Sequence, residues 1–468
     1  MIPGKRDFRT ASAKAVADET LGAAIRKTAN LLFDLRTAGV AATPGFEALR
    51  EWGRGRKHEV SGKLDHYVHR FGERLQAFGG VIHFARDAAD VARVVRQIAR
   101  ERGARTAVKS KSMTAEEVSL NEILAEAGVT VTETDLGEFV IQIAGEKPSH
   151  ILAPAIHRNH AQVAELFHEI LGTPRDLSIE GLVTAARHAL RERFLSADIG
   201  ITGANFAVAD TGTLVLVTNE GNGRLTTSLP PVQIAIVGID KIIPGINDLP
   251  DFLRLLIRSA TGQVSSSYVT VITGPRRPGE EEGPEELHVV LLDNGRSRLA
   301  GGPFREMLHC LHCGACLNSC PVYQSVGGHA YESVYPGPMG DVISPLFWGL
   351  ETYADLPDAC TLCGRCAEVC PMKIPLPDFH RMLRALREGG KRGARLAADG
   401  LASAALSPIL YQGGLRGLRE LLGRANGPVK DGIVGSVLGN WTSCRDLPRA
   451  QGEESFRAWW RNRRQGLR

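Results

Sequence analysis

The stretch CLHCGACLNSCP (residues 310–321) is repeated fifty positions later as CTLCGRCAEVCP (residues 360–371). Each stretch reads C-x2-C-x2-C-x3-C-P, the spacing of bacterial [4Fe-4S] ferredoxins. Cysteines at every third position of a tight loop can bind three corners of an iron–sulfur cubane, whereas the fourth cysteine points elsewhere. In two-cluster ferredoxins that fourth cysteine ligates the other cluster. The repeat therefore predicts two [4Fe-4S] clusters with crossed ligation.

The crossed pattern assigns eight of the nine cysteines. The two predicted ligand sets are Cys310, Cys313, Cys316 and Cys370 for one cluster, and Cys360, Cys363, Cys366 and Cys320 for the other. Two structural zinc sites are the alternative, but zinc modules usually bring their cysteines as separated C-x2-C pairs. Disulfides are disfavoured in a chain expected in the cytoplasm, where thiols stay reduced. Iron–sulfur clusters are thus the favoured interpretation.

Composition describes an ordinary globular protein and sets limits on its partners. The chain has 468 residues, 43% of them hydrophobic and 23% charged, with a net charge of +4. That balance demands no nucleic-acid partner. The first residues lack the apolar core of a signal peptide, and no run approaches the roughly 18 apolar residues of a membrane span. We therefore expect a cytoplasmic protein without a transmembrane segment.

The cysteines also divide the chain, because none occurs before residue 310. Asn294, Gly295, Gly301, Gly302 and Pro303 predict a linker near residue 300. Helical periodicity predominates before about residue 79, and short β-rich runs then alternate with helical stretches. This succession predicts an α/β domain with a largely parallel sheet. The expected divisions are a helical region (1–78), an α/β domain (79–300), a mainly helical ferredoxin module (301–380) and a basic helical C-terminal region (381–468).

Several longer stretches carry a resemblance to a known family. They include KSKSMTAEEVSLNEIL, VTETDLGEFVIQI, SHILAPAIHRNH and the segment from Gly200 to Pro244, followed by the two cysteine motifs. In this order they resemble the lactate utilization protein B family, the iron–sulfur subunits of a bacterial three-protein L-lactate oxidation system. The resemblance implies an α/β domain similar to the CoA-transferase and ribose-phosphate-isomerase fold, joined to a ferredoxin module.

The resemblance also implies a function and partners. The chain would carry electrons during oxidation of L-lactate to pyruvate, together with two other lactate utilization subunits and an unidentified electron acceptor. The alternative is an iron–sulfur regulatory or scaffold protein with no direct role in turnover. The resemblance does not settle the catalytic residues, and no G-x-G-x-x-G fingerprint of a dinucleotide site occurs in the chain.

Candidate substrate-binding residues lie at the ends of two predicted strands, and those that follow a strand are favoured because ligands of α/β sheets lie beyond the carboxyl ends of strands. Lys109 and Lys111 end one strand, Glu220, Asn222 and Arg224 follow the other, and Asn205, Asp210 and Thr211 come just before it. Arg224 could hold a carboxylate in a fork, and glycines near it allow close backbone approach. The alternative for this loop is a turn needed only for packing, and the alternative for Lys109 and Lys111 is a solvated strand terminus. The candidates are Lys109, Lys111, Asn205, Asp210, Thr211, Glu220, Asn222 and Arg224.

Two further charge features remain open. Arg365 and Lys373 lie beside the second motif and could offset cluster charge, or they could be ordinary solvated side chains. Residues 381–468 contain 17 Lys and Arg residues against 7 Asp and Glu residues. Such a basic surface could attract an acidic partner or make a peripheral contact with an anionic membrane, or it could simply be solvated.

Overall fold

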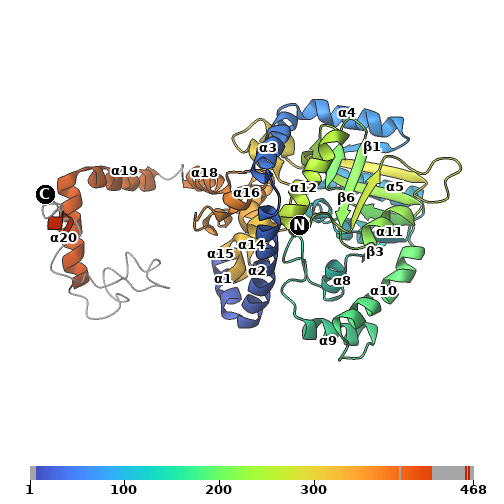
Figure 1. Ribbon diagram of the computed structural model, residues 1–468, viewed down its shortest axis with the longest axis horizontal. Helices are drawn as coiled ribbons and strands as arrows, with labels where there is room; N and C mark the ends of the chain where they lie inside the picture. The colour runs from blue at the N-terminus through green and yellow to red at the C-terminus, as the bar shows by residue number, and fades with distance from the viewer. Residues whose placement is uncertain (1–6, 389–391, 424–458, 461, 464–468) are drawn as a thin grey trace. The chain divides into compact units, whose positions relative to one another are not determined.

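The structure is a computed structural model that describes residues 7–388, 392–423, 459–460 and 462–463 (Figure 1). Its described residues up to Arg387 form one compact unit, and those from Glu388 onward belong to a second unit. No helix in the described part of the chain combines the length and hydropathy that a bilayer crossing requires.

Four helices precede the first strand, as the sequence predicts. Leu64, Tyr67, Phe71 and Leu75 recur at helical spacing in the fourth helix and are all buried. This spacing puts one apolar stripe against the rest of the fold. The helices are α1 (Phe8–Ala17), α2 (Glu19–Ala41), α3 (Phe46–Gly62) and α4 (Leu64–Ala77).

A six-stranded, fully parallel sheet follows, which confirms the α/β prediction. Its central strand Val232–Gly238 is buried along its whole length, as expected for a sheet covered on both faces. In spatial order the strands are β1 (Val81–Ala85), β10 (Glu286–Leu292), β7 (Val232–Gly238), β4 (Ile199–Thr202), β2 (Thr106–Lys109) and β3 (Thr130–Glu133).

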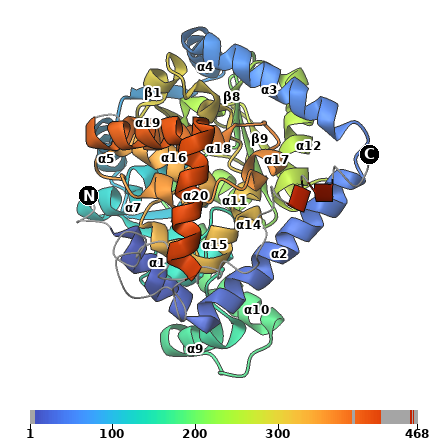
Figure 2. The same ribbon diagram turned by 90° about the vertical axis from the view of Figure 1, so that its left-hand side faces the viewer.

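Helices cover both faces of this sheet. One face packs against α5 (Ala88–Glu101), α6 (Met113–Glu117) and α7 (Leu120–Glu126). On the other face, α8 (Leu136–Ile143), α9 (His160–Leu171) and α10 (Ile179–Leu195) share a core with Val108 of β2. Figures 1 and 2 show α9 and α10 gathered together at one end of the compact unit.

A smaller sheet corrects part of the predicted topology. The runs TLVLVT and YVTVIT are strands, but they pair antiparallel with each other outside the parallel sheet. This second sheet has the order β8 (Ile242–Ile243), β5 (Phe206–Val208), β6 (Thr213–Thr218) and β9 (Tyr268–Ile272). Helix α11 (Asn222–Ser228) follows β6, and α12 (Leu249–Ala260) follows β8. Strand β6 is therefore not a strand of the parallel sheet.

The cysteine-rich region has no core of its own. One hydrophobic cluster joins Ile25 of α2, Phe252 of α12 and Leu317 of the first cysteine motif. The predicted linker is also packed, since Leu299 and Phe304 are each 5% exposed in this same cluster. Helices of this region are α13 (Arg296–Ala300), α14 (Ala315–Ser319), α15 (Pro321–Val326), α16 (Gly337–Trp348), α17 (Arg365–Val369) and α18 (Leu376–Glu388).

The second unit contains α19 (Arg392–Leu406) and α20 (Pro408–Gly423). Each carries large apolar side chains that are exposed, among them Leu401, Leu406 and Ile409. Most of the predicted basic region from residue 424 onward lies outside the described residues.

Candidate iron–sulfur site

The two cysteine loops have the same backbone conformation. His312 and Leu362, each directly before the second cysteine of its motif, have φ values of +55° and +56°. Gly314 and Gly364, directly after that cysteine, have φ values of +72° and +86°. Residues in the left-handed region reverse the chain tightly, which brings the cysteines of one motif to the same side.

Backbone amides also point at the cysteine sulfurs. The His312 amide donates to Cys310 Sγ at 3.4 Å, and the Leu362 amide donates to Cys360 Sγ at 3.3 Å. A third amide, that of Ile374, donates to Cys370 Sγ at 3.4 Å. Such N–H groups stabilise thiolates, the form in which cysteine binds metal.

One narrow pocket brings cysteines of both motifs together. Burial raises the pKa of Cys310 to about 12 and that of Cys313 to about 11, and the charge of Cys370 contributes to both shifts. Four thiols that are buried or half-buried and have raised pKa values suit a metal centre, since metal binding replaces their protons. The thiols that line the pocket, named the inner set, are Cys310, Cys313, Cys316 and Cys370.

The other four cysteines of the two motifs, named the outer set, are Cys320, Cys360, Cys363 and Cys366. Burial raises the pKa of Cys366 to about 12, and the charges of Cys360, Cys320 and Cys363 add to that shift, which indicates that the four thiols are neighbours. Cys363 is exposed, whereas Cys366 is 6% exposed. The outer set therefore reaches the protein surface.

A group of charged side chains lies at the carboxyl edge of the parallel sheet, after β2 and β3. Lys109 is 1% exposed, and its Nζ lies 2.9 Å from Glu116 Oε1 and 2.8 Å from Glu133 Oε1. Burial opposes the charge of Lys109, but the two carboxylates outweigh burial and raise its pKa. Lys109 is thus already neutralised within the protein.

Lys111 is less fully paired at the same edge. Its Nζ lies 4.0 Å from Glu138 Oε1, and both atoms are buried without a hydrogen-bond partner. Burial lowers the pKa of Lys111 and raises that of Glu138. Partial desolvation by neighbouring groups and the charge of Asp135 raise the pKa of Glu220 to about 7, although the residue is exposed. The carboxyl groups of Glu138 and Glu220 thus keep their protons to a higher pH than ordinary carboxyl groups do, as acid–base groups can.

Two family models match these two parts of the chain. A model described as "LUD domain" matches residues 68–292, and one described as "4Fe-4S dicluster domain" matches residues 306–374. The chain is also 40% identical to lactate utilization protein B of Bacillus pumilus, over 98% of both chains. The chain belongs to the lactate utilization protein B family.

Other similar proteins have related names. Lactate utilization protein B of Shouchella clausii is 44% identical over 87% of this chain and 86% of its own length. An Escherichia coli protein named uncharacterized electron transport protein YkgF is 40% identical, over 97% of this chain and 96% of its own. The LUD domain of this lactate utilization protein B family member is the α/β domain with the parallel sheet, and the dicluster domain contains all eight cysteines of the two motifs.

The structure separates the candidate substrate residues that the sequence grouped. Asn222 Nδ2 donates to Thr134 Oγ1 at 3.4 Å, and Thr134 Oγ1 donates to the Lys109 carbonyl at 3.0 Å. The Glu220 carboxylate accepts from the backbone amide of Leu136 at 3.2 Å. Lys109, Lys111, Glu220 and Asn222 therefore gather at the sheet edge.

The remaining candidates lie elsewhere or have structural partners. Asp210 accepts a hydrogen bond from the Ile246 amide at 3.0 Å, and it lies with Thr211 in the turn between β5 and β6. Asn205 accepts from the Val217 amide at 2.8 Å and so stabilises the β5–β6 hairpin. Arg224 is exposed on α11.

The cations chosen for their proximity to the second motif are engaged with other groups. The guanidinium of Arg365 lies over the Phe33 ring, 5.0 Å from its centroid. The ammonium of Lys373 forms ion pairs with Glu47 and Glu51. Both carboxylates are more than half exposed, so Lys373 is part of a solvated ion-pair group.

The residues that connect the LUD domain to the cysteine loops were not predicted from the sequence. His150 Nδ1 accepts from the Leu152 amide at 2.9 Å, so Nε2 carries the proton and donates to Asn318 Oδ1 at 3.0 Å. Asn318 lies between the third and fourth cysteines of the first motif. Two other missed residues, Arg36 and Lys241, lie near the inner set. Only Lys241 had a signal in the sequence, since it lies three residues after a buried strand.

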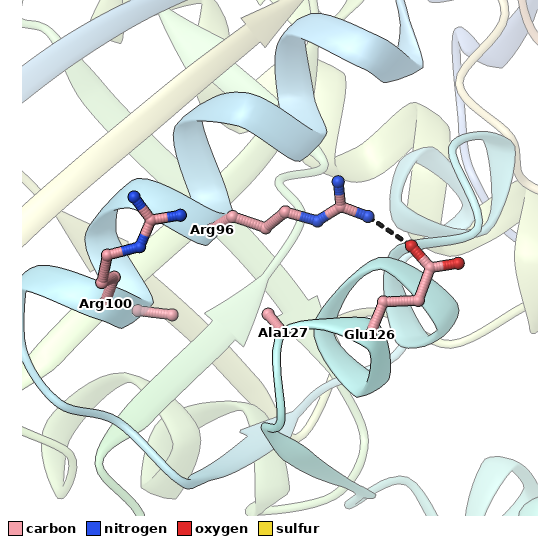
Figure 3. A pocket seen from close by; sticks show the side chains of 5 residues that line it. Arg96, Arg100, Glu126 and Ala127 are labelled. Atoms are coloured by element: carbon pink, nitrogen blue, oxygen red, sulfur yellow. Dashed lines mark hydrogen bonds and ion pairs between the residues drawn. The ribbon is translucent and has the colours of Figure 1, made fainter.

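A separate surface hollow lies between α5 and α7 and is lined by Arg96, Ala99, Arg100, Glu126 and Ala127 (Figure 3). Arg96 points toward Glu126 and pairs with its carboxylate, whereas Arg100 lies on the side of Arg96 away from Glu126. No cysteine and no sheet-edge residue lines this hollow. It is therefore distinct from the site formed by the cysteines.

Proposed function

We propose that this protein is the iron–sulfur electron-transfer subunit of a system that oxidises L-lactate to pyruvate. The observation that carries the proposal is the pocket lined by the four thiols of the inner set, packed against an LUD domain. The assignment to lactate oxidation comes from the names of its relatives, which refer to lactate utilization and to electron transport. Two other lactate utilization subunits and an electron acceptor of unidentified nature complete the system.

The two sets of thiols fit two [4Fe-4S] clusters, one bound by the inner set and one by the outer set. Bound clusters of this type exchange single electrons at potentials set by their surroundings. Cys370 belongs to the second motif but lines the inner pocket with three cysteines of the first motif, and this supports crossed ligation. The protein surrounds the inner set with buried apolar groups, including Ile151, Met339 and Met372, which limit access of water.

In the LUD domain, the carboxyl edge of the parallel sheet is better suited to hold protons than to bind an anion. Lys109 and Lys111 at the sheet edge are outnumbered by carboxylates, among them Glu116, Glu133 and Glu138. A lactate carboxylate would be repelled by this surplus unless some of these groups are protonated. We infer that Lys111 and Glu220 are the remaining substrate candidates and that another subunit completes the catalytic site.

Three further points belong to this proposal. The LUD domain is assigned a fold similar to CoA-transferase and ribose-phosphate isomerase. The protein acts in the cytoplasm, where its eight motif thiols stay reduced until they bind iron. The basic C-terminal region, residues 381–468, serves an acidic partner or a peripheral membrane contact.

The test is anaerobic purification of the full chain with and without its two partner subunits. Iron content and the spectrum of the purified chain measure the clusters, and addition of L-lactate measures electron entry. We expect clusters in both preparations but reduction by lactate only when the partners are present. Clusters that remain oxidised throughout lactate turnover by the complete system would instead favour a regulatory or scaffold role.

A further inference from the structure

Buried nitrogen atoms without hydrogen-bond partners gather around the inner set. Among the described residues, these atoms include Arg36 Nε, Lys241 Nζ and His312 Nε2. Buried donors in native proteins nearly always have an acceptor, so each such donor requires an explanation. The pocket of the inner set, which His312 also lines, offers one, because a bound cluster presents sulfur atoms as acceptors.

Arg36 approaches the inner set from α2. Its side chain is buried, and Nη2 donates to the carbonyl of Val369 at 2.7 Å, directly before Cys370 in the chain. The pKa of Arg36 lies below its ordinary value, because burial lowers it more than the charges of Cys313 and Cys370 raise it. Within the described part of the chain, no carboxylate forms an ion pair with Arg36. A buried guanidinium so placed needs an anion.

Lys241 approaches the inner set from the carboxyl edge of the parallel sheet, three residues after β7. Its Nζ lies 3.1 Å from Asp240 Oδ2 but makes no hydrogen bond, and its charge lowers the pKa of Cys310. Asp240 also pairs with Arg296, which forms a second ion pair with Glu117 at 2.5 Å.

The charges of this buried network do not cancel. Lys57 donates to the carbonyl oxygens of Asp240 and Ile242, and so adds a third buried amine or guanidinium to the group. Two carboxylates, Asp240 and Glu117, thus lie among three basic side chains. Lys241 and Arg296 pair with these carboxylates, whereas Lys57 donates to carbonyl oxygens. The tyrosine hydroxyl of Tyr335 donates to Glu117, and the Tyr335 ring contacts that of His312, 5.2 Å between centroids. The surplus positive charge therefore adjoins the first cysteine loop.

We propose that Arg36 and Lys241 are positioning residues for the inner cluster, which direct N–H groups at its sulfur atoms and stabilise its reduced form. The inference goes beyond the proposed function but depends on its assignment of a cluster to the inner set. A reduced cluster carries one more negative charge than the oxidised cluster, so a nearby buried cation favours reduction. The LUD domain and the N-terminal helices thereby set the potential of a cluster whose ligands they do not supply.

The experiment uses full-length protein with both clusters reconstituted anaerobically. Reduction of each cluster is followed by electron paramagnetic resonance during a redox titration of the wild type, Arg36→Gln and Lys241→Gln. The matched control is Lys373→Gln, which removes a cation that lies three residues after Cys370 but pairs with exposed carboxylates. Iron content is measured for every variant, so that cluster assembly and cluster potential are separated. The spectrum of Cys363→Ser identifies the outer cluster.

At the wild-type midpoint of the inner cluster, we expect its reduced-to-oxidised ratio to fall by about tenfold in either variant. The outer cluster and Lys373→Gln should keep wild-type midpoints. Unchanged inner midpoints in both variants, or an equal shift in Lys373→Gln, would overturn the inference. If Arg36→Gln loads no inner cluster, Lys241→Gln and the charge-retaining Lys241→Arg carry the test, and equal midpoints in these two would also overturn it. Absence of iron from the wild type would instead refute the proposed function.

Discussion

The inner and outer cysteine sets share one local structure but differ in what covers them. The loops from Cys310 to Cys316 and from Cys360 to Cys366 have matching left-handed positions and matching amide-to-sulfur hydrogen bonds. The inner set lines a pocket formed with buried apolar side chains. The outer set includes the exposed Cys363, with Leu362 beside it 38% exposed.

The most deeply buried charged groups near the two sets differ in sign as well, although the half-buried cation Arg384 also lies near Cys360. Arg36 and Lys241 lie near the inner set. Near the outer set lies Asp341, a carboxylate that is 1% exposed, whose charge contributes to the raised pKa values of Cys320 and Cys360. Identical loops can thus hold clusters of different chemical character, because solvent exposure and nearby charge tune a cluster more than loop shape does.

The largest expected effect separates the two sets by their fourth ligands. Cys370→Ser should abolish the inner cluster and Cys320→Ser the outer cluster, each lowering iron from about eight to about four atoms per chain. Iron analysis and Mössbauer or electron paramagnetic resonance spectra of the full-length variants provide the measurement. Cys444→Ser is the control, since Cys444 belongs to neither motif. Loss of the Cys360 cluster in Cys370→Ser would show that each motif binds its own cluster.

The second prediction concerns the protein contacts that hold each loop. His150→Leu leaves Asn318 Oδ1 and the amides of Leu152 and Ala153 without their partner. We expect the free energy of unfolding to fall by about 2–4 kcal/mol, with bleaching of the inner cluster at lower temperature. Thermal unfolding followed by the absorbance of the clusters provides the measurement.

The matched variant for the outer loop is Arg384→Gln. Arg384 donates to the carbonyls of Pro357 at 2.8 Å and Cys360 at 2.6 Å, and its side chain is 27% exposed. Its loss should cost about 1 kcal/mol, because a partly exposed carbonyl regains hydrogen bonds from water. The outer cluster should then bleach first. Equal effects of both variants on both clusters would mean that the two loops do not respond separately.

A third prediction tests the difference in exposure directly. When a chelator is added to the air-exposed protein, the outer cluster should lose iron roughly tenfold faster than the inner cluster, since attack follows thiolate exposure. The two losses are followed by their separate spectra in a single sample. Loss of both clusters at one rate would indicate that the whole dicluster region opens as a unit.

Much of this architecture could be predicted from the sequence, because its signals are local. The thiol spacing identified both loops, and β-rich runs identified most strands of the parallel sheet. The central strand β4, IGIT, was missed because it is short and contains Gly200. Gly200 is required where α11 crosses the strand, since a Cβ atom there would collide with the Thr226 carbonyl.

The residues around the inner set could not be predicted, because they are distant in the chain. Arg36 lies more than 330 residues before Val369, whose carbonyl it contacts. Sequence proximity instead favoured Lys373, which pairs with Glu47 and Glu51. Arg224 was chosen on the assumption that β6 belongs to the parallel sheet, and the antiparallel pairing of β6 with β9 removes that reason.

The smallest expected effect comes from the sheet edge. His150 links this edge to the inner loop, because burial and the charge of Lys111 lower the pKa of His150, and His150 donates to Asn318. Among the described residues, the edge has no corresponding link to the outer loop. Burial raises the pKa of Glu138 above its ordinary value of 4.5. As the pH rises from about 5 to about 7, the unfolded chain loses the Glu138 proton while the folded protein retains it. The folded state therefore binds more protons in this range, and its stability falls as pH rises.

Glu138→Gln keeps the size of the side chain but cannot ionise, so it should flatten this dependence by about 1 kcal/mol between about pH 5 and about pH 7. Thermal unfolding at several pH values, followed by bleaching of each cluster, provides the measurement. Glu122→Gln, at an exposed position of α7, is the control and should leave the dependence intact. Because the edge is linked to the inner loop through His150, the change should appear in bleaching of the inner cluster and not of the outer one. An equal change in the bleaching of both clusters would mean that protonation of the sheet edge stabilises residues 7–387 as a whole. The two cysteine sets would then differ in exposure and in nearby charge, but not in their coupling to the LUD domain.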